Sequence, residues 1–290
     1  MIEAKESDDI IVATNLVKKY GEKYALDGID LRIKRGEIFG FLGPNGAGKT
    51  TTVRILSTLT DYDKGSASID GFDIKKCPTE AKVRIGVIQQ SISLDKDLTV
   101  WENMNHRALM YQMTKKERVS RIEELTEYFS LSEYLDRKID SLSGGWKKRV
   151  AIVCTMVHSP TIVFLDEPTV GLDIKARRLL WDLIRLLNKK GTTVFLTTHY
   201  IEEAENLCDR VGIIDEGEII ALGTPEKLSS DVGKFTVEYT NAEGQTTYEY
   251  FQDMESASVS ASKFPSGEVL MRKTNLEDCF VELTGKKVGG

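Results

Sequence analysis

The chain has 290 residues, enough for one large domain or for a large and a small one. Hydrophobic residues make up 41% and charged residues 29% of it, as in ordinary globular proteins, which excludes a disordered, collagen-like or coiled-coil chain. The net charge of -6 gives no support to a broad phosphate-binding surface, so we expect no nucleic-acid partner and only a local phosphate site.

The sequence shows no signal for secretion, membrane insertion or metal capture by cysteine. The first nine residues are acidic and carry no apolar stretch, so we expect no secretory signal. No run approaches the roughly 18 apolar residues of a membrane helix, which predicts a chain that is soluble by itself in the cytosol. The four cysteines form no C-x-x-C pair, so neither a zinc site nor a redox motif is indicated.

Strand and helix patterns alternate along the first three quarters of the chain. Two stretches at 10–17 and 24–33 alternate apolar and polar residues and predict antiparallel strands. A helical period without β-type runs predicts a helical insertion between 98 and 142. Short apolar runs, mostly separated by helical patterns, indicate buried parallel strands of an α/β sheet at 38–42, 85–88, 162–165, 194–197 and 211–215.

The last part of the chain changes in character. A leucine-rich stripe over 174–190, followed by Gly191, predicts a helix that covers the sheet, and Thr224-Pro225 opens one more helix. After about Ser229 we predict a small α+β accessory domain. Its expected elements are three strands and a short amphipathic helix, at 235–239, 247–251, 268–271 and 276–283.

A glycine-rich loop between a predicted strand and a predicted helix carries the clearest chemical signal. Glycines let successive backbone N–H groups and the helix N-terminus point at phosphate oxygens. Lys49 adds a cation for the β and γ phosphates, and the Thr50 hydroxyl suits Mg²⁺. By itself this loop permits a kinase, a GTPase or a motor. It fits the pattern G-x-x-x-x-G-K-[ST] as Gly43-Pro-Asn-Gly-Ala-Gly-Lys49-Thr50.

Two adjacent carboxylates end the apolar run at 162–165. Asp166 suits a metal-orienting role, and Glu167 suits the activation of water. Without the glycine loop, the same pair would also fit a plain turn at the end of a strand.

A third motif, Leu142-Ser-Gly-Gly-Trp146, precedes the acidic strand and is followed by a basic helical stretch. With the glycine loop, it resembles the signature of ATP-binding-cassette (ABC) ATPases. The resemblance covers about residues 10 to 228 and continues in the expected order at Tyr20, Gln90, Gly171-Leu172-Asp173 and His199.

This resemblance implies an α/β fold, the P-loop NTPase fold of ABC type. A mixed sheet core would carry an antiparallel β-subdomain and a helical subdomain at about 98–142. The nucleotide-binding domain would span 1–228 and the accessory domain 229–290. The accessory domain fits a packing role and a regulatory role equally well.

The resemblance further implies an ATPase that binds ATP and Mg²⁺. Glu167 would be the general base, and His199 would orient the γ-phosphate and the attacking water. Tyr20 would stack on adenine, although Tyr24 is close enough to compete. Thr50 and Gln90 would coordinate Mg²⁺, and Asp166 would hold it directly or through water. Gln90 is preferred to its neighbour Gln89 and counted as a catalytic residue. The phosphates would be held by Gly43, Pro44, Asn45, Gly46, Ala47, Gly48, Lys49, Thr50 and Thr51.

In this family two chains sandwich two nucleotides head to tail. Ser143, Gly144 and Gly145 would therefore complete the ATP site of the opposite subunit, and Asp173 would lie in the D-loop. The complete set of site residues favours a homodimer. Trp146 departs from the usual Gln at the last signature position, and its indole has one donor and no acceptor. We therefore expect Trp146 to alter nucleotide affinity or contact with the partner, while the site still hydrolyses ATP.

The closing segment 274–285 resembles the end of the daunorubicin-resistance type of exporter ATPase. That resemblance implies the ATP-hydrolysing subunit of a membrane exporter, in which ATP-driven dimerisation powers transport. The chain would bind peripherally, on the cytoplasmic side of the membrane, to a separately encoded integral membrane permease docked near residues 91–97. The alternative is a soluble ABC-type ATP switch protein without a membrane partner. The sequence leaves the transported substrate open.

Overall fold

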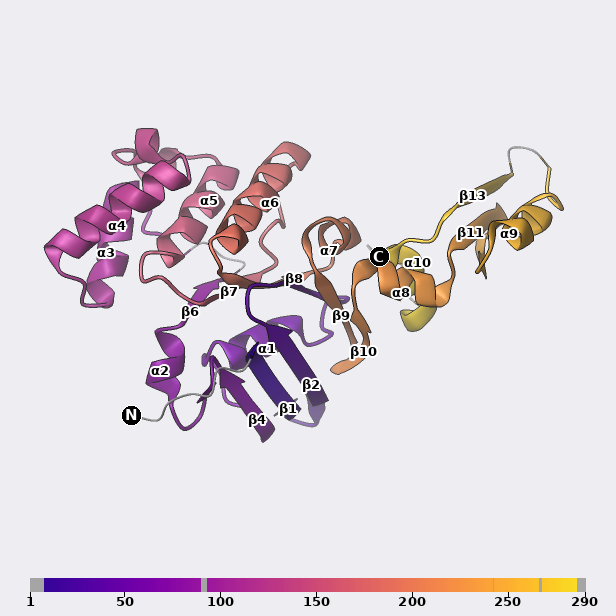
Figure 1. Cartoon of the computed structure of the whole chain (residues 1–290), viewed down its shortest axis with the longest axis horizontal. Helices are drawn as coiled ribbons and strands as arrows, with labels where there is room; N and C mark the ends of the chain where they lie inside the picture. The colour runs from indigo at the N-terminus through magenta and orange to yellow at the C-terminus, as the bar shows by residue number, and fades with distance from the viewer. Residues whose placement is uncertain (1–7, 90–92, 242, 266–267, 286–290) are drawn as a thin grey trace.

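The computed structural model describes residues 8–89, 93–241, 243–265 and 268–285. Figure 1 shows an elongated molecule in which a helical part lies at one end and a small sheet with its helix at the other. A central sheet lies between them. Within the described ranges, no helix is both long and apolar enough to cross a membrane.

The N-terminal sheet is antiparallel and has the strand order β2-β1-β4-β5. The predicted antiparallel strands are confirmed, because β1 and β2 pair antiparallel around a turn at Gly21 and Glu22. The pairing of β1 with β4 adds strands that the sequence did not predict. The bounds are β1 Asp9–Tyr20, β2 Lys23–Lys34, β4 Lys64–Ile69 and β5 Phe72–Asp73.

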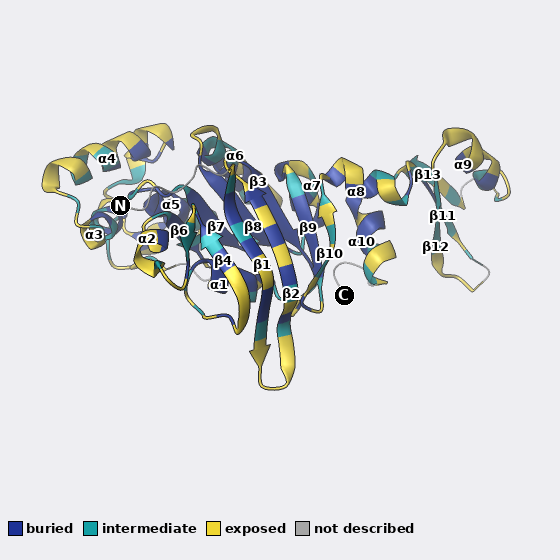
Figure 2. Ribbon diagram, turned by 60° about the horizontal axis from the view of Figure 1, so that its bottom comes forward, coloured by how far each residue is buried: buried dark blue, intermediate teal, exposed yellow. Residues whose placement is uncertain are grey.

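The central sheet has the order β10-β9-β3-β8-β7-β6. All its neighbouring pairs are parallel except β9 with β10, so the sheet is mixed. Strands β3, β7 and β8 are buried along their whole length, as the dark blue ribbons in Figure 2 show. The strands are β3 Ile38–Leu42, β6 Ile85–Ile88, β7 Ile162–Asp166, β8 Thr193–Thr198, β9 Arg210–Asp215 and β10 Glu218–Gly223.

This strand order decides where the functional segments meet. Because β3, β8 and β7 are neighbours and parallel, their carboxyl ends lie side by side at one edge of the sheet. Leu42 pairs with Thr198, and Asp166 pairs with Thr197. The loops that follow these strands therefore converge, although the loop after β3 is more than a hundred residues from the other two in sequence.

The predicted helical insertion is confirmed as two helices and two short 3₁₀ turns, followed by a third helix. Thr99 and Thr114 cap the first two helices, each in a reciprocal capping box with a glutamate three residues later. The elements are α3 Val100–Met110, α4 Lys115–Tyr128, the turns Ser132–Tyr134 and Ile139–Ser141, and α5 Gly144–Thr155.

The remaining helices of this part lie close to the two sheets. The predicted cover helix is α6, which buries its apolar stripe against the core and ends just before Gly191 in the left-handed region. The bounds are α1 Lys49–Leu56, α2 Pro78–Lys82, α6 Ile174–Lys189 and α7 Ile201–Leu207.

The C-terminal part contains the three predicted strands, in a sheet of order β12-β11-β13. It also contains the predicted amphipathic helix, α10. Helix α9 was not predicted. Helix α8 packs on α10 and spans residue 229, where we expected the accessory domain to begin. The bounds are α8 Pro225–Val232, β11 Phe235–Thr240, β12 Thr246–Phe251, α9 Met254–Ala261, β13 Val269–Lys273 and α10 Leu276–Thr284.

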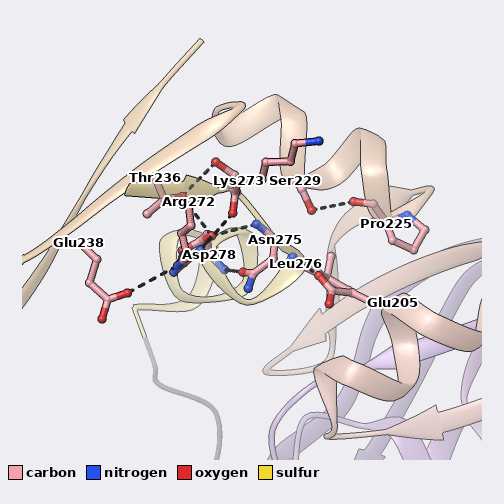
Figure 3. A network of polar contacts seen from close by, with 11 residues as sticks. Glu205, Pro225, Ser229, Thr236, Glu238, Arg272, Lys273, Asn275, Leu276 and Asp278 are labelled. Atoms are coloured by element: carbon pink, nitrogen blue, oxygen red, sulfur yellow. Dashed lines mark hydrogen bonds and ion pairs between the residues drawn. The ribbon is translucent and has the colours of Figure 1, made fainter. Parts of the chain in front are cut away.

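A polar network fixes α10 in place (Figure 3). The Arg272 guanidinium donates two hydrogen bonds of 2.6 and 2.9 Å to the buried Asp278 carboxylate. Thr236 on β11 donates a third, of 3.1 Å. The Leu276 N–H donates to Glu205 on α7 at 2.5 Å. Helix α10 is thus tied both to the small sheet and to the central domain.

Candidate active site

The glycine loop lies between β3 and α1, as predicted. Gly48 has φ +114, and a Cβ there would lie 2.6 Å from the Ala25 carbonyl oxygen, so only glycine fits without strain. The tight loop opens directly into α1, whose first N–H groups have no partner within the helix. A cavity of about 240 Å³ lies at this point, lined by Ala25, Asn45, Gly46, Gly48, Lys49, Thr50, Thr51 and Glu167.

Lys49 places a buried cation in the wall of this cavity. Its Nζ donates to the carbonyl oxygens of Gly43 at 2.8 Å and Pro44 at 3.1 Å. The same nitrogen lies 3.3 Å from Glu167 Oε1. The loop carbonyls and the carboxylate therefore hold the ammonium group at the place where an anionic ligand would be neutralised.

Asp166 ends β7 and accepts two hydrogen bonds from threonine hydroxyls. Its Oδ1 accepts a hydrogen bond of 2.6 Å from Thr197 and one of 3.2 Å from the Thr50 hydroxyl. A hydroxyl and a carboxylate side by side are the hard oxygen ligands that Mg²⁺ takes from proteins, with water and phosphate supplying the others. Thr50 and Asp166 therefore fit the ion that the sequence motif implies.

Glu167 adopts an unusual backbone conformation. Its φ of +48 lies in the left-handed region, which residues other than glycine seldom occupy. Its N–H donates to Thr197 at both the carbonyl oxygen, at 3.2 Å, and the hydroxyl, at 3.0 Å. These contacts from β8 hold the residue in its strained position and turn its carboxylate into the cavity.

Sequence reasoning missed the role of Thr197. Its hydroxyl touches both acidic residues, but the residue itself was placed only as the end of an apolar run. No local signal could have shown the contact, because it depends on the pairing of β8 with β7.

His199 follows β8 and lies against the same carboxylate. Its Nδ1 is 3.2 Å from Glu167 Oε2, and its ring packs against Tyr200 with centroids 4.2 Å apart. The structure thus brings Lys49, Thr50, Asp166, Glu167 and His199 together.

The structure does not decide which residue stacks on adenine or which glutamine is the third metal ligand. Gln90 lies outside the described residues. Its neighbour Gln89 lines a second cavity of about 230 Å³ together with Thr50 and Asp166. Tyr20 and Tyr24 are both exposed near the hairpin turn, each with a lysine ammonium near its ring. The choice within each pair stays a prediction.

The signature residues lie elsewhere on the chain, at the start of α5. Ser143 caps the helix and its hydroxyl accepts from the Trp146 N–H at 3.5 Å, while Gly144 and Gly145 form the first turn. Asp173 caps α6 in the same way, by accepting from the Ala176 N–H. Ser143, Gly145 and Asp173 line one cavity of about 130 Å³, which is separate from the glycine-loop cavity.

Trp146 is engaged within its own chain. Its ring stacks on Tyr134 with centroids 4.1 Å apart and planes 26° apart. The Arg149 guanidinium lies 5.0 Å from the indole centroid. The indole therefore packs against the segment that leads into the signature.

The chain is also similar in sequence to known proteins. Residues 26–170 match the family model described as ABC transporter. The linearmycin resistance ATP-binding protein LnrL of Bacillus subtilis (strain 168) is 43% identical over 228 residues, which are 79% of this chain and 73% of the relative. The Nod factor export ATP-binding protein I of Burkholderia orbicola (strain AU 1054) is 37% identical over 94% of this chain and 96% of its own length. The daunorubicin resistance ATP-binding protein DrrA2 of Streptomyces coeruleorubidus is 43% identical over 80% of this chain and 72% of its own.

Solved structures show the same fold. CbiO1 from Clostridium perfringens, part of the ABC transporter complex cbiONQ, superposes with a TM-score of 0.72 at 29% identity, over 77% of this chain and 91% of that one. The dimeric, post-hydrolysis state of the ATP-binding cassette MJ0796, bound to ADP and Pi, superposes with a TM-score of 0.65 at 30% identity. It covers 74% of this chain and 98% of that chain. These similarities confirm the fold expected from the sequence.

Proposed function

The chain belongs to the ABC transporter family, and from this premise we propose that it is the ATP-hydrolysing subunit of a membrane exporter. The arrangement around the glycine-loop cavity carries the proposal. Lys49 and Glu167 line this cavity, Asp166 contacts its wall through Thr50, and His199 contacts it through Glu167. Relatives named for drug resistance and for Nod factor export support the direction of transport. The nucleotide-binding domain covers 1–228 and the accessory domain 229–290, and helix α8 spans the boundary between them.

Each residue has a definite task in hydrolysis. The loop from Gly43 to Thr51 binds the phosphates through its backbone N–H groups, and Lys49 neutralises charge on the β and γ phosphates. Glu167 accepts the proton of the water that attacks the γ-phosphorus, as the bond to the leaving ADP oxygen breaks. His199 orients the γ-phosphate and that water. Bound Mg²⁺, held by Thr50, Asp166 and Gln90, supplies charge stabilisation on the phosphate oxygens.

The second part of the proposal is a head-to-tail homodimer. Ser143, Gly144 and Gly145 at the N-terminus of α5 present the positive end of that helix to ATP held by the partner. ATP then joins two subunits, and loss of phosphate lets them part. The dimeric state of a structural relative supports this arrangement.

The third part is a membrane partner. An integral membrane permease binds near residues 91–97, next to the helical insertion. Residues 91 and 92 lie outside the described part of the chain. A structural relative that is part of an ABC transporter complex supports such an assembly. The chain then lies peripherally on the cytoplasmic side of the membrane.

The test combines phosphate release with light scattering, for wild type and Glu167→Gln in Mg²⁺ and ATP. We expect the variant to lose hydrolysis by about a hundredfold or more and to accumulate as a dimer. Glu255→Gln makes the same chemical change at an exposed position on α9, and it should hydrolyse ATP as wild type does. Hydrolysis by Glu167→Gln near the wild-type rate would refute the assignment of the base. A hydrolysis-dead variant that stays monomeric would refute the homodimer.

A further inference from the structure

Glu203, the third residue of α7, is a fully buried carboxylate outside the catalytic set. Its Oε2 accepts a hydrogen bond of 3.1 Å from the Thr169 hydroxyl, and its Oε1 accepts one of 3.1 Å from Trp181 Nε1. The Thr198 side chain also favours the charged form of this carboxylate. Burial raises the pKa of Glu203, and these hydrogen bonds oppose that rise. A buried carboxylate is costly unless such donors satisfy it, so these three contacts are what keep it there.

The two donors and Thr198 come from segments that flank the catalytic residues. Thr169 lies two residues after Glu167, and Thr198 immediately precedes His199. Trp181 lies on α6, the helix that Asp173 caps. The Glu203 carboxylate therefore links the segment that follows Glu167 to the segment that carries His199.

The segment that follows Glu167 is also held by a contact from α5. Lys148 on α5 donates to the Val170 carbonyl oxygen at 2.6 Å. Burial lowers the pKa of Lys148, while the carboxylates of Glu203 and Glu167 oppose that effect. Because Glu167 has a strained φ of +48, its conformation persists only where the surroundings fix it.

We propose that Glu203 is a positioning residue, which holds Glu167 and His199 in their relative places by joining Thr169, Thr198 and Trp181 to α7. It touches no reacting atom in this scheme. The inference rests on the proposed function, because it takes Glu167 and His199 as the residues that act on water and phosphate.

The test measures kcat and KM for ATP, with the binding of ATP and the thermal midpoint, in Glu203→Leu, Glu203→Gln and Thr169→Val. Leucine fills the space but accepts no hydrogen bond, so kcat should fall by about tenfold or more while KM changes by less than about threefold. Glutamine accepts from Trp181 and donates to a threonine hydroxyl, so it should restore kcat to within about threefold of wild type. Thr169→Val removes one link, and its kcat should fall by about threefold or more.

Glu205→Gln is the matched control, because Glu205 lies on the same helix and contacts Leu276 instead of the site. It should keep the wild-type kcat. If Glu203→Leu does not fold, the kcat of Thr169→Val decides the question.

Two results would overturn the proposal. One is a wild-type kcat in Glu203→Leu or, where that variant does not fold, in Thr169→Val. The other is a loss of ATP binding as large as the loss of kcat, which would make Glu203 a purely structural residue. Glu167→Gln in the same assay separates the two hypotheses, since the proposed function fails only if that variant still hydrolyses ATP.

Discussion

His199 Nδ1 and Glu167 Oε2 lie 3.2 Å apart, so a carboxylate and an imidazole from neighbouring strands face one another across the site. The other oxygen of the same carboxylate lies 3.3 Å from Lys49 Nζ. Glu167 is therefore held between two nitrogen groups that come from distant parts of the sequence. This arrangement fixes the base near the glycine loop, where a γ-phosphate would lie in the proposed function.

Thr197→Val tests the hydroxyl that joins the two acidic residues. That hydroxyl donates to Asp166 at 2.6 Å and accepts from the Glu167 N–H at 3.0 Å. Without it, both residues lose a fixed partner, so we expect kcat to fall by about tenfold or more. Steady-state phosphate release over a range of Mg²⁺ concentrations measures the effect.

Thr193→Val is the control for this prediction. Thr193 is fully buried on the same strand, but its hydroxyl accepts from the Gly36 N–H. The two variants should lose similar stability, and only Thr197→Val should lose turnover. Equal turnover in the two variants would argue against a role for the Thr197 hydroxyl.

Trp146 is tested in the Glu167→Gln background by replacement with phenylalanine and with alanine. Because the indole stacks on Tyr134 at 4.1 Å, phenylalanine should keep much of the stack and alanine should lose it. We expect the alanine variant to need about tenfold more ATP to dimerise, since the first turn of α5 is then less well fixed. Light scattering during an ATP titration measures this. The prediction fails if alanine and tryptophan give the same titration.

Arg272→Met tests the ion pair that fixes α10. The change leaves the buried Asp278 carboxylate without its guanidinium partner, and breaking such a pair costs about 3–5 kcal/mol. We expect Arg272→Met to speed hydrogen exchange in 233–285 relative to wild type, and to change exchange in the central sheet less. Lys263→Met removes the same charge from an exposed position and should leave exchange unchanged. Equal protection in the two variants would contradict the importance of the pair.

His158 makes stability depend on pH. Burial lowers the pKa of this histidine to about 4, and the nearby charges of Arg107 and Arg121 add to that effect. In the unfolded chain its pKa is ordinary, about 6.5, so the unfolded state binds the proton first as the pH falls. The folded state thus has its full stability above about pH 6.5 and loses on the order of 3 kcal/mol at most as the pH falls toward 4.

His158→Phe checks this directly. Phenylalanine keeps the ring stack on Tyr111 but loses the hydrogen bond that Nε2 donates to the Ile85 carbonyl. The variant should be less stable at pH 7.5 and should show a smaller loss of thermal midpoint between pH 7 and 5. His106→Gln, at an exposed position on α3, should keep the wild-type slope. An unchanged slope in His158→Phe would refute the prediction.

Contiguous patterns in the sequence were enough to predict much of the fold and part of the site. The alternation in 10–17 and 24–33 predicted antiparallel strands, and the short apolar runs predicted the buried strands of the central sheet. The glycine loop, the acidic pair and the signature are each local, because a phosphate cradle or a strand end is built from neighbouring residues. Strands β4 and β10 and helix α9 were missed, since short half-exposed segments carry weak periodicity.

The contacts between those local pieces were decided only by the tertiary structure. Thr197 meets Asp166 and Glu167 because β8 lies between β3 and β7, and no sequence pattern contains that order. Glu203 meets Thr169 and Trp181 because the fold brings α7 into contact with α6 and with the loop that follows β7. The physical reason is the sequence distance over which each effect acts. Backbone periodicity and turn chemistry act over a few residues, whereas strand pairing and burial join groups that are tens of residues apart.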